Sequence, residues 1–302
     1  MGQHRGLTIK IRRNGPVFKI GTLADWFGVG LLDGIRASQQ CGASGVQIYA
    51  WNELDPRKVT AGQIAQIKST ARACAQEVTA LCGELGGHGF EIAADNPEKV
   101  DYLKRTVDLA LALDCRVITT HIGRVPEDKT SARWANMLSA CCEAGAYAAQ
   151  NGVTIAVETG PEPIPRLMDF LSGCKAGIGV NYDPANLVMV TRDDEVEGVY
   201  TAGSAIVHTH AKDGRCNFYA GPEKVYGIFA EGGIEALNTV STYFSDLPLG
   251  QGEVRWDPYL QALADIGYNG YLTIEREVGG NAGADIRLAV RFLKEKLNEL
   301  GL

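Results

Sequence analysis

The sequence predicts an α/β fold, namely a single-domain (β/α)8 barrel, also called a TIM barrel, that spans residues 1–302. Short apolar runs alternate with longer amphipathic ones, which is typical of repeated βα units around a parallel sheet. These units number eight, and 302 residues suffice for a barrel that typically needs about 250. No Pro- or Ser-rich linker, charge run or low-complexity stretch divides the chain into two domains.

The expected strands and helices alternate along the chain. We expect strands over 18–24, 45–50, 77–83, 116–121, 153–158, 178–183, 205–210 and 270–275. The amphipathic stretches predict helices over 32–40, 61–76, 97–113, 131–150, 166–171, 193–200, 258–266 and 284–300. A doubly wound open sheet gives the same alternation, but eight units favour closure into a barrel.

Two stretches fall outside this repeat. Residues 1–17 form an N-terminal extension, and residues 213–257 form a long loop after the seventh strand. The loop is too long for an ordinary connector. We therefore expect either a surface insertion packed on its own aromatic side chains, or a lid or subunit contact over the mouth of the barrel.

Side-chain alternation orients a glutamate in two of the strands. Neighbouring side chains on a strand point to opposite sides. In the fifth strand, Ile155 and Val157 share the side opposite Glu158. In the eighth strand, Ile274 lies opposite Glu275. Since the apolar side of a barrel strand packs against the helices, both carboxylates should face the interior at the C-terminal ends, where barrel enzymes place their chemistry.

Four consecutive strands, the fifth to the eighth, end in groups that can bind a metal. The runs VETG, NYDPAN, HTHAKDG and TIERE offer Glu158, Asp183, a histidine and Glu275. Each alone is a weak signal, because a strand-ending Asp or Glu often caps the next helix. Together, three carboxylates at one mouth would repel unless a cation or shared protons offset their charge. Three oxygen ligands and one imidazole suit Mn²⁺, Mg²⁺ or Co²⁺.

These motifs resemble those of the xylose-isomerase-like sugar isomerases and epimerases, which include ketose 3-epimerases, hydroxypyruvate isomerase and inosose dehydratase. The resemblance covers nearly the whole chain from Phe18, and its most specific parts are VETG, GVNYDPANL, the H-x-H-x-K-D run from His208, and GYNGYLTIEREVG. It implies that the second histidine of the run is the ligand, so the metal set is Glu158, Asp183, His210 and Glu275. It also implies a tunnel-like site and assembly as a homodimer or homotetramer.

Four further residues are candidate substrate contacts: His121, Asn186, Lys212 and Arg215. His121 ends the fourth strand and could bind a substrate hydroxyl, the alternative being a capping or packing histidine. Lys212 shares the inward phase of His210 and could stabilise developing negative charge or bind a phosphate or hydroxyl, unless it is a solvated surface lysine. Asn186 and Arg215 are weaker candidates, because both also have ordinary loop explanations.

Three other side chains are assigned to the surroundings of the site. His208 points to the same side as His210 but one layer deeper, so we expect a core residue or a support for a ligand. Glu84 and Trp26, near the ends of the third and first strands, could line the pocket.

The two glutamates suggest a proton-transfer reaction. A metal bound to a carbonyl and a neighbouring hydroxyl stabilises the enediolate that forms when a proton leaves. Glu158 and Glu275 would be the catalytic residues, one taking the proton and the other returning it. The prediction is a metal-dependent epimerase or isomerase of a sugar or keto sugar, with Mn²⁺ first among the metals. An inosose-type dehydratase is the alternative, as is a non-catalytic sugar-binding barrel.

Composition argues against other classes of protein. The net charge is -7, from 29 basic and 36 acidic residues, which disfavours nucleic acid as a partner and leaves a small carbohydrate. An endonuclease of the apurinic type shares the fold, but it would need a histidine-rich multi-metal cluster, and the chain has five histidines. The run GVGLLDG from Gly28 has the wrong spacing for a dinucleotide fingerprint.

The chain shows no long apolar stretch, which predicts a cytoplasmic protein without membrane contact. Eight cysteines are present, and six of them, including Cys142 and Cys174, lie in or close to the expected helix and strand patterns. Because no C-x-x-C pair occurs and a chain of this length needs no disulfide framework, we expect reduced, mostly buried thiols.

Overall fold

Eight parallel strands close into a barrel, with neighbours in the order β1, β10, β7, β6, β5, β4, β3 and β2. Their bounds are β1 (Lys19–Leu23), β2 (Gly45–Tyr49), β3 (Glu77–Cys82), β4 (Val117–Thr120), β5 (Thr154–Glu158), β6 (Ile178–Tyr182), β7 (Ile206–Ala211) and β10 (Tyr271–Ile274). Strands β1 and β10 pair in parallel, with Ile20 opposite Leu272, and so close the barrel. The expected fold class is confirmed.

This computed structural model describes residues 18–276 and 282–302. The 1–17 extension and the EVG end of the last motif lie outside the described residues.

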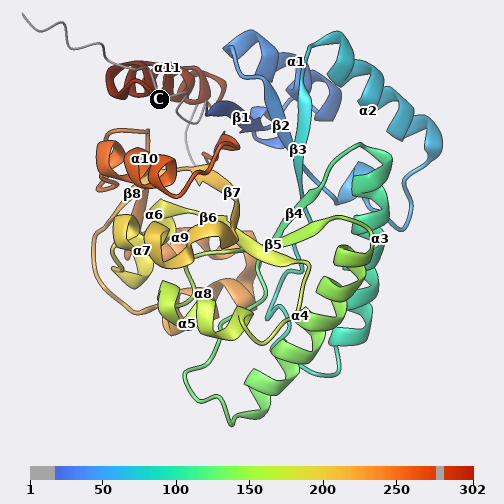
Figure 1. Cartoon of the computed structure of the whole chain (residues 1–302), viewed down its shortest axis with the longest axis vertical. Helices are drawn as coiled ribbons and strands as arrows, with labels where there is room; N and C mark the ends of the chain where they lie inside the picture. Colours follow the sequence, from blue (N-terminus) through green and yellow to red (C-terminus); the bar gives the residue numbers. More distant parts are fainter. Residues whose placement is uncertain (1–17, 277–281) are drawn as a thin grey trace, which may run out of the picture.

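Helices surround the strands (Figure 1). Those of the βα units are α1 (Leu31–Cys41), α2 (Ala61–Ala73), α3 (Asn96–Ala112), α4 (Ala132–Gln150), α5 (Ile164–Leu171), α7 (Glu195–Ala202), α10 (Trp256–Asp265) and α11 (Ala282–Leu300). Some begin where a side chain satisfies free backbone N–H groups. Thr60 and Gln63 form a capping box at α2, and Ser131 caps α4. Among the described helices, none has the length and apolar content to cross a membrane.

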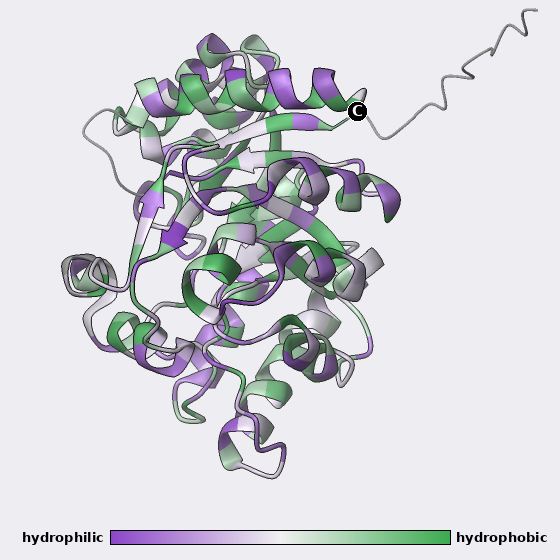
Figure 2. Cartoon of the chain, turned by 90° about the vertical axis from the view of Figure 1, so that its left-hand side faces the viewer, coloured by the Kyte–Doolittle hydropathy of each residue, from purple (hydrophilic) through white to green (hydrophobic). Residues whose placement is uncertain are grey.

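Side-chain alternation separates a packed apolar layer from a polar interior. Ile155 and Val157 of β5 and Leu272 and Ile274 of β10 belong to the hydrophobic core. In Figure 2 both the strands and the helices carry green residues beside purple ones, as two-sided elements do. Burying this apolar layer contributes about 25 cal/mol per Å², so it fixes which side of each strand faces inward. The inward side is thereby left to polar residues, as the alternation predicts.

The segment after β7 has secondary structure of its own. It forms β8 (Asp213–Cys216), α8 (Pro222–Gly232), the short helices η5 (Gly233–Ala236) and α9 (Leu237–Val240), and β9 (Phe244–Leu247). Strands β8 and β9 pair as an antiparallel sheet. The buried carboxylate of Asp213 accepts hydrogen bonds from the N–H groups of Gly250 and Val254 and from Trp256 Nε1. These charge-assisted bonds fix the point at which the segment returns to the barrel.

The expectation of reduced thiols is wrong for two cysteines. Cys142 on α4 and Cys174, just after α5, form a disulfide, with their Cα atoms 4.9 Å apart. They are 32 residues apart in the chain, and only the packing of α4 beside the end of α5 brings them together. The remaining thiols are free, namely Cys41, Cys74, Cys82, Cys115, Cys141 and Cys216.

Candidate metal and proton-transfer site

Four acidic and histidine side chains converge at the C-terminal end of the barrel. Glu158 is the last residue of β5, and His210 lies in β7. Asp183 and Glu275 directly follow β6 and β10. One ligand atom from each of the four lies within 4.8 Å of the others, and all four residues are buried. Since the four strands are neighbours in the barrel, the whole expected metal set meets at one point.

Two buried atoms in this cluster have no hydrogen-bond partner. Asp183 caps the short helix α6 (Pro184–Asn186) through Oδ1, which accepts from the N–H groups of Ala185 at 2.8 Å and Asn186 at 3.1 Å. Its other oxygen, Oδ2, and Nδ1 of His210 have no hydrogen-bond partner among the described residues. Their charged contacts include Lys212 Nζ, 3.9 Å from Oδ2, and Glu275 Oε2, 3.1 Å from Nδ1. Such unsatisfied groups cost about 1–3 kcal/mol each. A divalent cation would satisfy both, so the residues fit a metal with oxygen and nitrogen ligands.

The carboxylates of the cluster favour positive charge at their centre. Burial lowers the pKa of His210, but Glu275 and Glu158 outweigh burial and raise this pKa well above its ordinary value. Burial raises the pKa of Glu275, yet His210 and Lys212 hold it well below its ordinary value. A divalent cation held by these residues would supply the same kind of charge as the imidazolium and would leave Nδ1 of His210 free to act as a ligand.

A buried hydrogen-bond network orients His210 and Glu158. Oε1 of Gln47 lies 3.1 Å from Nε2 of His210. Because an amide oxygen only accepts, the Gln47 contact favours a proton on Nε2, and Nδ1 faces the carboxylates. Asn181 donates to Glu158 Oε2 at 3.1 Å, and its own oxygen lies 2.8 Å from Nδ1 of His208. His208 therefore lies one layer below the ligands, as its position in the strand predicts.

Gln47 and Asn181 are functional candidates that the sequence analysis did not single out. Each nevertheless carries a signal. Gln47 is the one amide in the otherwise apolar or aromatic run GVQIYA, and Asn181 shares the strand phase of Asp183 two residues later. An inward-facing amide next to a ligand strand is therefore a usable indication of a supporting residue.

Asn186 and Lys212 contact the two glutamates. Asn186 donates from Nδ2 to Glu158 Oε1 at 3.1 Å and to the carbonyl of Thr159 at 3.2 Å. Lys212 is buried, and its Nζ lies 3.1 Å from Glu275 Oε2. Both residues thus restrain the carboxylates. Direct contact of either with a substrate stays a prediction.

His121 lies between Glu158 and Glu84. Its Nε2 is 3.7 Å from Glu158 Oε1, and its Nδ1 is 3.0 Å from Glu84 Oε2. Burial lowers the pKa of His121, but Glu158 and Glu84 outweigh burial and raise it to about 10. The ring is therefore an imidazolium at neutral pH and can donate from both nitrogens. A charged donor at this position suits a substrate hydroxyl.

Helix α8 is fastened to the loops that follow β3 and β4. Glu223 accepts from Arg133 Nη2 at 2.6 Å, and its backbone carbonyl accepts from Arg124 Nη1 at 3.1 Å. At the other end of the helix, Glu231 Oε1 lies 2.9 Å from Nε2 of His88. These contacts favour a lid over a surface insertion for the segment after β7.

Tyr226 is the residue of α8 that reaches the cluster. Its ring centroid is 6.2 Å from that of His121. Its hydroxyl lies so close to Gly160 that a Cβ on that glycine would be only 2.1 Å away. Burial, with a contribution from the charge of Glu158, raises the pKa of Tyr226 well above its ordinary value. The hydroxyl is therefore neutral and able to donate, although no local sequence pattern identifies it.

Two other candidates have different outcomes. Arg215 lies outside the cluster, because it is exposed on β8 and donates from Nε to Asn217 at 3.2 Å. The chain turns away from the barrel after Asp213, so closeness in sequence to Lys212 did not bring Arg215 to the site.

Trp26 stays at the mouth, with its ring 6.5 Å from that of Tyr49 at the end of β2.

The fold agrees with comparisons to known proteins. The model of the xylose isomerase-like TIM barrel family matches residues 35–296. The chain belongs to this family. No curated protein matches it in sequence.

Solved structures of family-like barrels superimpose over almost the whole chain. A xylose isomerase domain protein from Planctomyces limnophilus is 24% identical, with a TM-score of 0.76 over 95% of this chain and 99% of the other. A D-tagatose 3-epimerase-like protein is 18% identical, with a TM-score of 0.71 over 94% and 98%. A probable 3-DHS dehydratase, AsbF of Bacillus anthracis, is 16% identical, with a TM-score of 0.72 over 92% and 99%. At these identities the likeness concerns the fold.

Proposed function

We propose that this chain is a divalent-metal-dependent epimerase or isomerase that moves a proton on a sugar or keto sugar. The observation that carries the proposal is one buried cluster in which two glutamates lie beside atoms of Asp183 and His210 that have no hydrogen-bond partner. The glutamates supply the bases, and those atoms supply ligand positions for a cation. A barrel that only binds sugar requires neither.

Glu158, Asp183, His210 and Glu275 would hold the metal, with Mn²⁺ first and Mg²⁺ or Co²⁺ as alternatives. When bound, the cation lowers the energy of the negative charge that develops as a proton leaves the carbon beside a carbonyl. Gln47 keeps Nδ1 of His210 turned toward the cation position by accepting from Nε2.

Glu158 and Glu275 would move the proton. Burial raises the pKa of each, but nearby positive side chains outweigh it and lower both pKa values, so both groups are ionised bases at neutral pH. One takes the proton from one face of the carbon, and the other returns a proton to the opposite face, which inverts the centre. Return to the neighbouring carbon would instead interconvert an aldose and a ketose.

Polar side chains around the cluster would position a small carbohydrate. His121 and Tyr226 each present a donor on the same side of Glu158, and a sugar hydroxyl between them could accept from both. Helix α8 excludes water above the cluster, which strengthens every electrostatic interaction below it. Assembly as a homodimer or homotetramer and the absence of a nucleic-acid partner stay predictions.

The test follows solvent deuterium into recovered sugar. Protein loaded with Mn²⁺ is incubated in deuterated water with ketoses, their phosphates, 3-oxo sugars and inososes, and the products are analysed by NMR. We expect deuterium at the inverted carbon. Glu158→Gln and Glu275→Gln should each lower turnover by at least ~10²–10⁴, whereas Glu127→Gln, an exposed control, should not.

The outcomes separate the alternatives. Loss of a β-hydroxyl in place of inversion would identify a dehydratase. Binding without deuterium uptake in any sugar would identify a non-catalytic barrel. Parental turnover in both Gln variants, fully loaded with metal, would overturn the two-base mechanism.

A further inference from the structure

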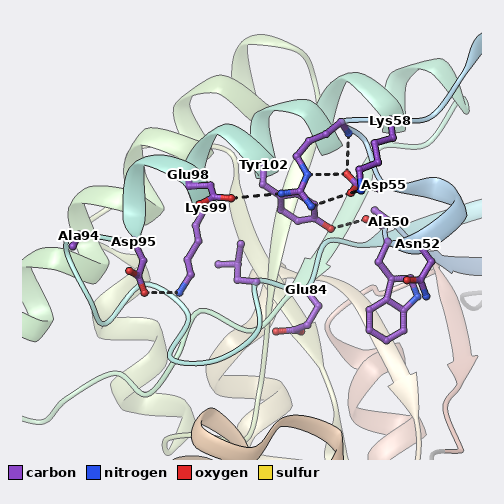
Figure 3. Close-up of a pocket in the computed structure, with 13 residues that line it drawn as sticks. Ala50, Asn52, Asp55, Lys58, Glu84, Ala94, Asp95, Glu98, Lys99 and Tyr102 are labelled. Atoms are coloured by element: carbon purple, nitrogen blue, oxygen red, sulfur yellow. Dashed lines mark hydrogen bonds and ion pairs between the residues drawn. The ribbon is translucent and has the colours of Figure 1, made fainter.

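A cavity of about 600 Å³ opens beside the cluster, between the loops after β2 and β3 and the start of α3 (Figure 3). Trp51, Asn52 and Glu84 line it on the barrel side, and Tyr102 of α3 lines it on the outer side. Cavities of about 300–1,000 Å³ accommodate whole drug-sized ligands. The cavity therefore has room for a sugar ring in addition to one at the cluster.

Glu84 connects this cavity to the cluster. Its side chain lines the cavity, and its Oε2 lies 3.0 Å from Nδ1 of His121. The other nitrogen of His121 is 3.7 Å from Glu158 Oε1. A single imidazole ring thus separates the cavity wall from a metal ligand. The cavity and the cluster are therefore neighbours across His121.

The charges around the cavity disfavour an anionic occupant. Its cations are paired with carboxylates. Arg57 lies 2.9 Å from Asp55, and Lys99 lies 3.6 Å from Asp95, a pair that Figure 3 also shows. The lining contains four carboxylates and three cations in all. A phosphate or carboxylate would meet net negative charge and donors already engaged. A neutral molecule with many hydroxyls can use the same groups as donors and acceptors.

Trp51 offers an aromatic platform in this polar lining. Its ring stacks on that of Tyr49, with centroids 4.7 Å apart and an angle of 23° between the planes. Trp51 is nevertheless 51% exposed, so one face of the indole is open. Because Tyr49 already holds the indole ring in place, a ligand that stacks on Trp51 meets a preorganised surface. Binding then costs little side-chain entropy. The apolar C–H face of a pyranose fits such a surface.

We infer that this cavity is a second sugar subsite, which takes the neutral glycosyl unit of a disaccharide or glycoside while the other unit lies at the metal cluster. The inference rests on the proposed function, since it names the substrate class of the same site. The reacting sugar would be anchored at the cluster, and Trp51 with its polar neighbours would select substrates that carry a second ring.

The experiment compares one ketose alone and with a glucosyl unit attached. D-Fructose, maltulose and isomaltulose are titrated into Mn²⁺-loaded protein by calorimetry, and solvent deuterium is followed into each sugar. We expect at least one disaccharide to bind about tenfold or more tightly than fructose, a difference that calorimetry resolves. Trp51→Ala should bring the ratio of the two affinities to about one.

Two further variants test whether the preference for a disaccharide depends on the cavity. Ala94→Trp adds a bulky side chain to the cavity lining at a position remote from Trp51 in the sequence, and it should remove the same preference. Tyr200→Ala, which deletes an exposed aromatic on α7, should keep it. Equal affinity for all three sugars, no binding of any, or a preference that survives both cavity variants would overturn the subsite. A Trp51-dependent preference without deuterium uptake would leave the subsite standing and overturn the isomerase proposal.

Discussion

The two halves of the barrel mouth differ in charge and in the work they can do. The half formed by β5, β6, β7 and β10 carries all four side chains of the metal cluster. The half formed by β1 to β4 contributes the neutral Gln47, the aromatic Trp26 and Trp51 and the paired ions of the cavity lining, with the Glu84–His121 pair at the border. Under the two proposals above, the β5–β10 half would bind the metal and move the proton, and the β1–β4 half would recognise the sugar.

This division has a physical reason. Three carboxylates within a few ångströms can be buried only where a cation or an imidazolium compensates them, so they must lie together. Recognition of a sugar needs spread-out donors, acceptors and an aromatic face, which work best away from that concentrated charge. The difference implies that mutations in the two halves should change different measured quantities.

The largest effect should come from removing a metal ligand. Asp183→Asn or His210→Ala should lower Mn²⁺ affinity by more than the ~10–100-fold typical of residues that only support ligands, as measured by calorimetry on metal-stripped protein. Thr22→Val in β1, a buried change of similar size in the other half, should leave affinity unchanged. Equal metal content in the parent and both ligand variants would show that the cluster is not the metal site.

Gln47 provides the next test, because it lies in the recognition half but acts on the charged half. Gln47→Leu removes the acceptor for Nε2 of His210 and should lower Mn²⁺ affinity about 10–100-fold. Thermal unfolding of the same variant, measured without metal, controls for damage to the barrel. If Mn²⁺ affinity is unchanged while the barrel remains folded, the two halves are independent and Gln47 does not set the tautomer.

Glu162, in the loop after β5, should make stability depend on pH. It is buried, its Oε2 accepts from the N–H of Val125, and burial raises its pKa to about 8. The folded state therefore holds a proton that the unfolded state has released, so stability should fall as pH rises from about 5 and level off above 8. The loss should be about 2 kcal/mol between pH 6 and pH 8.

Denaturant titrations across that range measure the effect. Glu162→Gln keeps an acceptor for Val125 and cannot ionise, so its stability should not show this fall. A parent and variant with parallel pH curves would mean that Glu162 is ionised in the folded protein.

The smallest effect should come from the lid. Tyr226→Phe removes one hydroxyl that can donate to substrate, and the net contribution of about 0.5–1.5 kcal/mol per hydrogen bond predicts a two- to tenfold loss in kcat/KM. Tyr219→Phe, an exposed change in the same segment, is the matched control. Equal kinetics for the parent and Tyr226→Phe would remove the hydroxyl from the site and leave α8 as a cover only.

Strand phase accounts for most of what could be predicted. A carboxylate opposite a row of apolar side chains must point inward, so Glu158, Glu275 and the histidine run could be placed before the fold was known. The same rule applies to Gln47 and Asn181, which were overlooked because neutral amides rarely stand out among ligands. Strand phase gives no guidance after Asp213, where the chain leaves the barrel. Arg215 therefore lies outside the cluster, and its contact with a substrate stays a prediction.

The sequence by itself determined the eight βα units, the inward side of each strand and three carboxylates with a histidine at the strand ends, because these follow from local periodicity and from residue type. The choice of His210 over His208 came from the family resemblance. Only the tertiary structure decided what meets across the chain: Tyr226 over Gly160, the disulfide of Cys142 and Cys174, and the cavity beside Glu84. These contacts join segments far apart in sequence, and their geometry depends on how helices and loops pack, which no local pattern encodes.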